Sequence, residues 1–345
     1  MRIEDYIRQQ PAVLAALPAI VGPRLRRVDA LRQRPERLIL VGTGSSMNAL
    51  VAAGPALEAA TGATLSFKEP EAFLRAPPRT EGPRALVLVL SQTGFSVTPI
   101  EVVRRSRALG LPTVAVVADA ASPLAQTGVE TVLIPIGEEA VGPKTKGYTA
   151  SVLTLLAIAA HFGGSAPETA GLESAMQAAL ETSEEASRRL VATIGVPGYV
   201  LVAGQFGHAG TALEGALKIA EITGIPTSGY DIEEALHGHV YGTDRDSLLV
   251  VIARDEAEAR VADNLGAALT ELGPRCAIVN LSGHATRFDM DIRWPASKAG
   301  WADATWALFP LQWLALHLSA AKGIAEAGMI YPDLGKRLNV RIRTA

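Results

Sequence analysis

The chain has 345 residues and a formal net charge of −3, from 32 basic and 35 acidic residues. Hydrophobic residues make up 48% of it, which is typical of a globular protein and excludes an intrinsically disordered chain. Aromatic residues are few and no long basic block occurs, so nucleic acid is not an expected partner. The length favours two domains.

Signals of metal binding, secretion and membrane insertion are missing from the sequence. The single cysteine, Cys276, cannot form an internal disulfide, and no Cys or His cluster has the spacing of zinc ligands. The N-terminus lacks the apolar core of a signal peptide. Residues 152–160 and 305–321 are apolar, but they are too short or too interrupted to span a bilayer. We therefore expect a cytoplasmic protein without a membrane partner.

Strands and helices alternate through the first half of the chain, after a helical segment at 1–30. The predicted strands are 37–41, 64–67, 86–90, 113–118 and 131–136, and the main predicted helices are 47–60, 100–109 and an Ala/Leu-rich helix that ends near Phe162. This alternation indicates a parallel sheet with helices on both faces.

The strand predicted at 86–90 is an unbroken apolar run that stops at the turn 91–96, with the sequence SQTGFS. This turn places three hydroxyls, an amide and a glycine just before a helical pattern that begins near Pro99. The N-terminus of a helix has unsatisfied N–H groups and a partial positive charge, so such a turn suits a phosphate. Taken alone, the same residues also fit an ordinary polar loop.

Two matches at one spacing indicate an internal duplication. Residues 86–92 resemble residues 248–254, and Pro112 resembles Pro274, in both cases 162 positions apart. The halves differ in the turn after the matched strand, where SQTGFS is replaced by ARDEAE. We therefore expect the first half to keep a phosphate-binding turn that the second half has lost.

Three charged residues share one face of a helix predicted at 212–221, with the sequence ALEGALKIAE. Glu214, Lys218 and Glu221 stand at positions i, i+4 and i+7. One interpretation is a solvated ion-pair face. The other is a buried helix whose charges line a cleft or an interface, because the surrounding residues are small and apolar. A carboxylate buried beside a lysine is one way to tune a general base.

His237 lies beside a glycine in a predicted loop at 229–239. An imidazole in such a loop is able to transfer protons near neutral pH. A structural role is the alternative, and these residues alone do not distinguish the two.

Six motifs are similar to those of the double SIS-domain proteins, the sugar-isomerase family, and in particular to the isomerase half of glucosamine-6-phosphate synthase and its deaminase and deglycase relatives. They are GTGSS at 42–46, SQTGFS at 91–96, PKTKGYT at 143–149, ALEGALKIAE at 212–221, EEALHG at 233–238 and DLGK at 333–336. The motifs cover nearly the whole chain in the family's order.

This resemblance implies an α/β fold made of two tandem three-layer αβα SIS domains, each with a mainly five-stranded parallel sheet flanked by helices. The first domain would be residues 1–165, including the N-terminal helical segment, and would bind phosphate. The second would be residues 166–345, with a linker helix, the second SIS domain, a C-terminal tail and the catalytic residues.

The resemblance also implies roles for individual residues. Glu221 would move a proton between C1 and C2 of the sugar, and His237 would assist ring opening. Lys218 and Glu214 would support Glu221, and Lys336 would lie over the sugar and be able to form a Schiff base. The sugar phosphate would be bound by Ser45, Ser91, Gln92, Thr93 and Ser96, and the sugar by Ser46 and Lys144. Such chemistry needs neither metal nor cofactor.

Three positions depart from the family's usual pattern. Phe95 replaces a carboxylate, His239 replaces a proline, and Lys144 stands where the family usually has serine. The hydroxyls needed for phosphate are kept, so these changes bear on the identity of the substrate.

We expect a deaminase or isomerase that converts an amino-sugar 6-phosphate, such as glucosamine-6-phosphate, into fructose-6-phosphate and ammonia. The alternatives are a deglycase of fructosamine-type 6-phosphates and a sugar-phosphate sensor without turnover. We expect no glutaminase domain before the first strand. We also expect a homodimer with the active site at the subunit interface.

Overall fold

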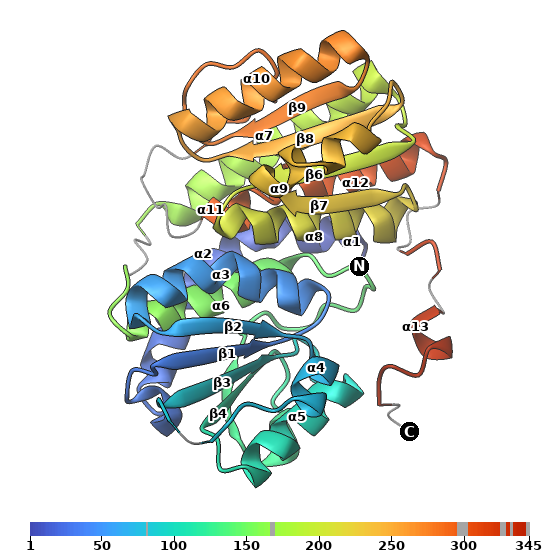
Figure 1. The fold of residues 1–345 in the computed structure, drawn as a ribbon. Helices are drawn as coiled ribbons and strands as arrows, with labels where there is room; N and C mark the ends of the chain where they lie inside the picture. Colours follow the sequence, from blue (N-terminus) through green and yellow to red (C-terminus); the bar gives the residue numbers. More distant parts are fainter. Residues whose placement is uncertain (81, 166–169, 295–302, 325–328, 332–333, 343–345) are drawn as a thin grey trace. The chain divides into compact units, whose positions relative to one another are not determined.

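A computed structural model describes residues 1–80, 82–165, 170–294, 303–324, 329–331 and 334–342 (Figure 1). The chain divides into two compact units, each built around one sheet. The first-sheet unit comprises Val13–Glu139, Lys146–Thr169 and Tyr331–Ala345. The second-sheet unit comprises Met1–Ala12, Ala140–Thr145 and Ala170–Ile330.

Five parallel strands form the first sheet, in the order β2-β1-β3-β4-β5. They are β1 (Arg37–Val41), β2 (Thr64–Lys68), β3 (Ala85–Leu90), β4 (Thr113–Val117) and β5 (Glu130–Leu133). The central strand β3 is buried along its whole length, as its apolar sequence predicts. The chain runs outward in opposite directions from β1 and β3, so the loops after these two strands diverge. In open α/β sheets, this is the edge where ligands bind.

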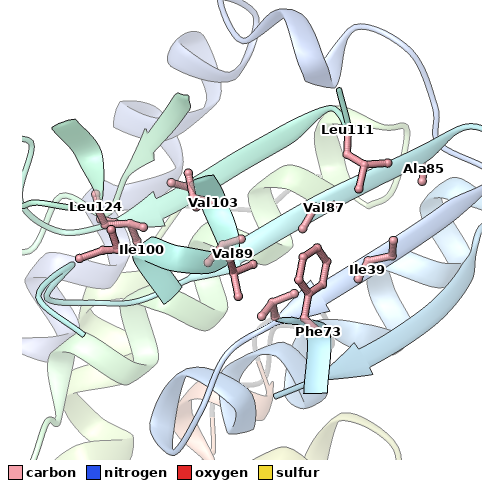
Figure 2. Packing of buried hydrophobic residues seen from close by; sticks show 13 residues of the cluster. Ile39, Phe73, Ala85, Val87, Val89, Ile100, Val103, Leu111 and Leu124 are labelled. Atoms are coloured by element: carbon pink, nitrogen blue, oxygen red, sulfur yellow. The ribbon is translucent and has the colours of Figure 1, made fainter. Parts of the chain in front are cut away.

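Helices cover both faces of the first sheet (Figure 1). They are α3 (Ser45–Thr61), α4 (Pro70–Arg75), α5 (Val97–Ala108) and α6 (Lys146–His161), with α2 (Gln10–Leu25) and the 3₁₀ turns η1 (Asp29–Leu31) and η2 (Ala125–Thr127) beside them. Helices α3 and α6 pack together on one face, and α4 and α5 cover the other. Figure 2 shows the core on the second face, where Phe73, Ile100 and Val103 meet Val87 and Val89.

Four parallel strands form the second sheet within the described residues, in the order β7-β6-β8-β9. They are β6 (Tyr199–Gly204), β7 (Thr227–Asp231), β8 (Ser247–Ala253) and β9 (Arg275–Asn280). Two parallel sheets flanked by helices confirm the predicted α/β class, but the second sheet has one strand fewer than expected.

The missing fifth strand is reduced to a single parallel bridge between Ile278 and Asp289. Pairing stops there because the chain turns at once. The Asp289 carboxylate accepts a hydrogen bond from the backbone N–H of Asp291, and Asp291 has a left-handed φ of 58°. The side-chain amide of Asn280 holds the other carboxylate oxygen at 2.6 Å.

The second sheet also has helices on both faces (Figure 1). They are α1 (Ile3–Arg8), α7 (Leu172–Ile194), α8 (Gly207–Thr223), α9 (Ile232–Leu236), α10 (Glu256–Leu272), α11 (Asp303–Trp306) and α12 (Phe309–Ala321), with η3 (His239–Gly242). Helices α7, α8 and α12 pack on one face, and α9 and α10 on the other. The short helix α13 (Leu334–Arg337) belongs to the first-sheet unit.

Corresponding elements of the two units have the spacing expected from a duplication. The first strands begin at Arg37 and Tyr199, 162 positions apart, and the helices that follow begin at Ser45 and Gly207, also 162 apart. The repeat found in two sequence matches therefore extends to the elements around them.

The most apolar helices, α6 and α12, are interior elements. Fourteen residues of α6 are buried, and α12 buries both of its aromatic side chains, Phe309 and Trp313. None of the helices in the described part of the chain has the length and apolarity needed to cross a membrane.

Candidate functional site

The turn after β3 is held in place by backbone hydrogen bonds. Gly94 N–H donates to the Ser91 carbonyl at 2.9 Å, and the Gln92 carbonyl accepts from Ala118 N–H at 2.8 Å. Helix α5 begins at Val97, three residues earlier than predicted. Ser96 is its N-cap residue, and within the described residues its side chain makes no capping hydrogen bond. The turn therefore presents hydroxyls at a helix N-terminus, as a phosphate site requires.

The turn after β1 reaches the same edge of the sheet. Gly44 has a φ of 56°, which favours glycine, and Ser45 and Ser46 are the first residues of α3. Because β1 and β3 are parallel neighbours, their carboxyl ends lie together. The structure therefore places Ser45 and Ser46 at the same sheet edge as the Ser91–Ser96 turn.

The structure predicts that a side chain at Gly94 lowers the free energy of unfolding strongly. Its φ is 73°, and a Cβ added there would lie 2.2 Å from the Ser122 hydroxyl oxygen. We expect Gly94→Ala to cost about 1–3 kcal/mol more in unfolding free energy than Gly110→Ala, because of this overlap. Gly110 has a similar φ of 68° and no atom within 4 Å of an added Cβ, so it isolates the conformational penalty. Equal losses in urea unfolding would contradict the prediction.

The Gln92 side chain lies against the N-terminus of α6. A Cβ on Gly147 would come within 2.9 Å of Gln92 Nε2, and Gly147 N–H donates to Glu139 Oε2 at 3.0 Å. Gln92 Oε1 is buried and has no hydrogen-bond partner among the described residues. One hydrogen-bond acceptor among the residues predicted to bind phosphate, Gln92 Oε1, is therefore unsatisfied in the described part of the first-sheet unit.

Two lysines lie at the start of α6, Lys144 two residues before it and Lys146 as its first residue. Lys144 is half-buried and donates to the Val141 carbonyl at 2.9 Å. Lys146 is buried and donates to the Ile136 carbonyl at 2.9 Å. Burial lowers the pKa of Lys146, against the opposing influence of Glu139. The sequence did not predict Lys146 and Glu139 as site residues, because the burial that lowers the pKa of Lys146 is decided by the fold.

The C-terminal segment pairs with the Ser91–Ser96 turn of its own unit. Ser96 and Arg341 form an antiparallel bridge, and Ile342 N–H donates to the Phe95 carbonyl at 2.8 Å. Lys336 is in α13 of this segment, but its side chain lies outside what the structure describes, as does Asp333 of the DLGK motif. The tail that carries the predicted Schiff-base lysine is thus attached to the turn by backbone hydrogen bonds.

In the second-sheet unit, α8 brings its three charged residues together. Lys218 Nζ lies 3.4 Å from Glu214 Oε1 and is hydrogen-bonded to Glu221 Oε2. The side chains of Glu214 and Lys218 are 0% and 1% exposed, whereas that of Glu221 is 23% exposed. This burial excludes the solvated ion-pair face. Of the three, Glu221 is the group that solvent or a substrate reaches.

Electrostatics keep this lysine charged although it is fully buried. Desolvation lowers the pKa of Lys218, but Glu214 and Glu221 outweigh it, and the pKa ends above its usual value. The charged Lys218 donates a hydrogen bond to the Glu221 carboxylate and so fixes its position. The arrangement therefore provides a partly exposed carboxylate base held by a buried cation.

Glycines allow α8 to lie close to its neighbours. A Cβ on Gly215 would come within 2.3 Å of Leu311 in α12, and a Cβ on Gly229 within 2.5 Å of the Leu213 Cα. Helix α8 is therefore enclosed between β7 and α12, which explains how its charges become buried.

His237 ends the short helix α9, which begins after the capping carboxylate of Asp231. Its ring is exposed, and Nδ1 lies 2.7 Å from the Glu233 carbonyl. Because a carbonyl only accepts, Nδ1 carries the proton and Nε2 is left to exchange one. The neighbouring His239 instead stacks on Tyr230 with ring centroids 3.7 Å apart.

The second unit has carboxylates where the first has the hydroxyls that are predicted to bind phosphate. Glu258 corresponds to Ser96 at the 162-residue spacing and is buried. Its Oε2 accepts from the Arg254 backbone N–H at 2.8 Å, and Asp255 caps α10 by accepting from Glu258 N–H at 3.0 Å. A protein carboxylate thus bonds to the backbone of this turn, which disfavours a bound anion.

Burial raises the pKa of Glu258 above its usual 4.5, so folding favours its protonated form. The stability that this provides is present below about pH 4.5 and is lost as the pH rises through the raised pKa. We expect Glu258→Gln to raise the melting temperature relative to the parent at pH 7.5 and to lose this advantage at pH 4. The control is Glu256→Gln, because Arg260 lowers the pKa of Glu256. A pH-independent difference for Glu258→Gln would count against this account.

Within the described residues, no group of three or more His, Cys, Asp or Glu side chains has the arrangement of a metal site. The available chemistry is that of a carboxylate base, a buried ammonium and an imidazole on the second-sheet unit, and of hydroxyls at helix N-termini on the first.

Residues 199–322 match the SIS domain family, and this range contains the second sheet, the charged residues of α8 and His237. The second half of the chain therefore matches an SIS domain, and the chain resembles the isomerase half of glucosamine-6-phosphate synthase. This confirms the resemblance drawn from the motifs.

The chain is 27% identical to a glutamine–fructose-6-phosphate aminotransferase (isomerizing) of Acidithiobacillus ferridurans, over 93% of this chain and 56% of that protein. It spans about half the length of such relatives.

Two solved structures share the fold over nearly their whole length. The C-terminal domain of glucosamine-fructose-6-phosphate aminotransferase from Francisella tularensis has a TM-score of 0.79 at 19% identity, covering 93% of this chain and 96% of that one. Glucosamine-6-phosphate deaminase from Thermotoga maritima has a TM-score of 0.77 at 18% identity, covering 96% and 97%. At these identities the likeness concerns the fold.

Proposed function

We propose that this chain is a phosphosugar isomerase of the SIS family that deaminates an amino-sugar 6-phosphate. The substrate we infer is glucosamine-6-phosphate, and the products are fructose-6-phosphate and ammonia. The observation that carries the proposal is the partly exposed Glu221 carboxylate paired with the buried ammonium of Lys218. A protein that only senses sugar phosphates would need the Ser91–Ser96 turn but not this base.

In this proposal, the Ser91–Ser96 turn and Ser45 bind the phosphate, and Ser46 and Lys144 contact the sugar. His237 returns a proton to the ring oxygen as the hemiacetal opens. Glu221 removes the proton from C2 and delivers it to C1, while a second proton passes from the amino nitrogen to O1, and together these transfers convert the open-chain amino aldose into a 2-imine with a hydroxyl on C1. Water then adds to the imine carbon and ammonia leaves, so one water is consumed for each ammonia released.

Lys218 and Glu214 act on Glu221 rather than on the sugar. Lys218 holds the Glu221 carboxylate in place through a hydrogen bond, and Glu214 compensates the buried charge of Lys218. The role of Lys336, as a group over the sugar or as a Schiff-base amine, belongs to the proposal as well.

The direct test incubates the purified protein with glucosamine-6-phosphate and measures fructose-6-phosphate and ammonia together. We expect the two products in equal amounts. If neither appears while sugar phosphates still raise the melting temperature, the deaminase assignment fails, and fructosamine-type 6-phosphates are tested next as deglycase substrates. Failure of those as well would leave a sugar-phosphate sensor.

We also propose that the protein acts as a homodimer, because exposed apolar side chains such as Tyr241, Leu338 and Val340 suit an interface. Light scattering at micromolar concentration should give twice the chain's 36.1 kDa mass. A monomer would contradict the dimer and leave the proton relay to residues of one chain.

A further inference from the structure

The two turns proposed to bind the sugar phosphate contain no cationic side chain. Residues 42–48 read GTGSSMN and residues 91–98 read SQTGFSVT, so their polar side chains are hydroxyls and amides. A phosphate ester carries a charge of about −1.5 to −2 at neutral pH. The N-termini of α3 and α5 each contribute only about half a positive charge. Part of the phosphate charge is therefore left for a side chain from elsewhere in the chain to balance.

The C-terminal segment brings a cation to the Ser91–Ser96 turn. Ser96 and Arg341 stand opposite each other in an antiparallel bridge, and both belong to the first-sheet unit. Two backbone hydrogen bonds flank this pair without joining it. They run from Val97 N–H to the Val340 carbonyl at 3.3 Å and from Ile342 N–H to the Phe95 carbonyl at 2.8 Å.

This arrangement decides where the Arg341 side chain begins. A pair flanked in this way is the non-hydrogen-bonded pair of an antiparallel ladder, in which the Cα atoms are about 4.5 Å apart. The two side chains of such a pair lie on the same face and contact each other easily. Arg341 therefore leaves the backbone on the same side as the Ser96 hydroxyl. Its side chain is much longer than that of serine, so its guanidinium reaches a group bound by that hydroxyl.

The Arg341 guanidinium is not engaged elsewhere in the described part of the chain. The residue is exposed and forms no ion pair with the described residues. Lys146 is a cation near the Gln92 side chain, but it is buried, donates to the Ile136 carbonyl at 2.9 Å and interacts with Glu139. A guanidinium is also better suited than an ammonium to a phosphate, because its planar N–H groups donate to two oxygens at once.

From this pairing we propose that Arg341 is a ligand of the sugar phosphate. Its guanidinium binds the phosphate group that Ser96 contacts, and its charge favours phosphorylated over unphosphorylated sugars. Because the phosphate site belongs to the proposed function, the role of Arg341 rests on that function. It concerns the binding of the phosphate and not the proton transfer by Glu221.

Calorimetric titration of the full chain with fructose-6-phosphate tests this role, because this probe carries the phosphate and has no amino group to lose. We expect Arg341→Gln to bind it at least about tenfold more weakly than the parent, with a smaller dependence on salt concentration. Arg341→Lys keeps the charge but not the planar group, so its affinity should lie between the two. The melting temperature should not change in Arg341→Gln, because Val340 and Ile342 supply the hydrogen bonds of the segment.

The matched control is Arg104→Gln, which removes the same charge from an exposed residue of α5. Arg104 lies seven residues after the first residue of this helix, about 10 Å along its axis, where salt screens most of its effect on a phosphate. Its affinity should stay within about twofold of the parent. An equal loss in Arg104→Gln and Arg341→Gln would trace the effect to net charge and overturn the role of Arg341.

Unchanged affinity in Arg341→Gln, or a parent that does not bind fructose-6-phosphate, also overturns it. The proposed deamination fails separately. If Arg341→Gln weakens binding but the parent releases no ammonia from glucosamine-6-phosphate, the role of Arg341 stands without the deaminase activity. If the parent and Arg341→Gln release ammonia with the same KM, the deaminase activity stands without the role of Arg341.

Discussion

Glu221→Gln should reduce deamination of glucosamine-6-phosphate by about 100- to 10,000-fold, the usual contribution of a positioned acid–base group. Glutamine keeps the shape of the side chain but cannot carry the proton between C2 and C1. Because Glu221 is not among the proposed phosphate ligands, the affinity for sugar phosphate should stay within a few-fold of the parent. Turnover is measured through ammonia release and affinity through calorimetry.

The control for this experiment is Glu256→Gln, which removes an exposed carboxylate of α10 paired with Arg260. It should leave turnover unchanged. If Glu221→Gln retained more than a tenth of the parent's turnover, the proton relay would have to be assigned to another group. If it lost binding as well as turnover, Glu221 would be a ligand of the sugar rather than the base.

Lys218→Met should be strongly destabilising, by about 3–5 kcal/mol in the free energy of unfolding. The substitution removes the cation that lies 3.4 Å from Glu214, and the Glu214 side chain is 0% exposed. An uncompensated carboxylate at such a position must either stay charged in an apolar surrounding or take up a proton. Urea unfolding followed by circular dichroism measures the loss.

The double variant Glu214→Gln, Lys218→Met separates this cause from simple loss of packing. With both charges gone, no fully buried ion is left without its counterion, and Glu221 is partly exposed, so much of the stability should return. A double variant as unstable as Lys218→Met would show that the methylene stem of the lysine, rather than its charge, supports α8. Turnover should remain low in both variants, because Glu221 loses its cation in each.

Local patterns of the sequence were sufficient for most of the fold. The apolar run 37–41 is β1 without change, and the turn residues Gly62 and Gly224 end α3 and α8 in the left-handed conformation. These features depend on residues near each other in the chain, so they are visible before any tertiary contact is known. The spacing of 162 residues then predicts where the corresponding elements of the second unit begin.

The failures of prediction lie where the local pattern does not decide the outcome. The resemblance to SIS-domain proteins implied a fifth strand in the second sheet, but Asp289 and Asn280 bond side chain to side chain and the chain turns away at Asp291. Helix α5 was expected near Ile100, but its first turn already includes Val97, because Ser96 is extended and acts as the N-cap.

What the sequence alone determined is the α/β class, the duplication, the polar turns at the strand ends and the common face of Glu214, Lys218 and Glu221. Only the tertiary structure decided that Glu214 and Lys218 are enclosed while Glu221 reaches the surface. The physical reason is that the two properties depend on residues at different distances along the chain. The period of a helix sets which side chains share a face, but the desolvation of each one depends on neighbours distant in sequence, such as Leu311 against Gly215.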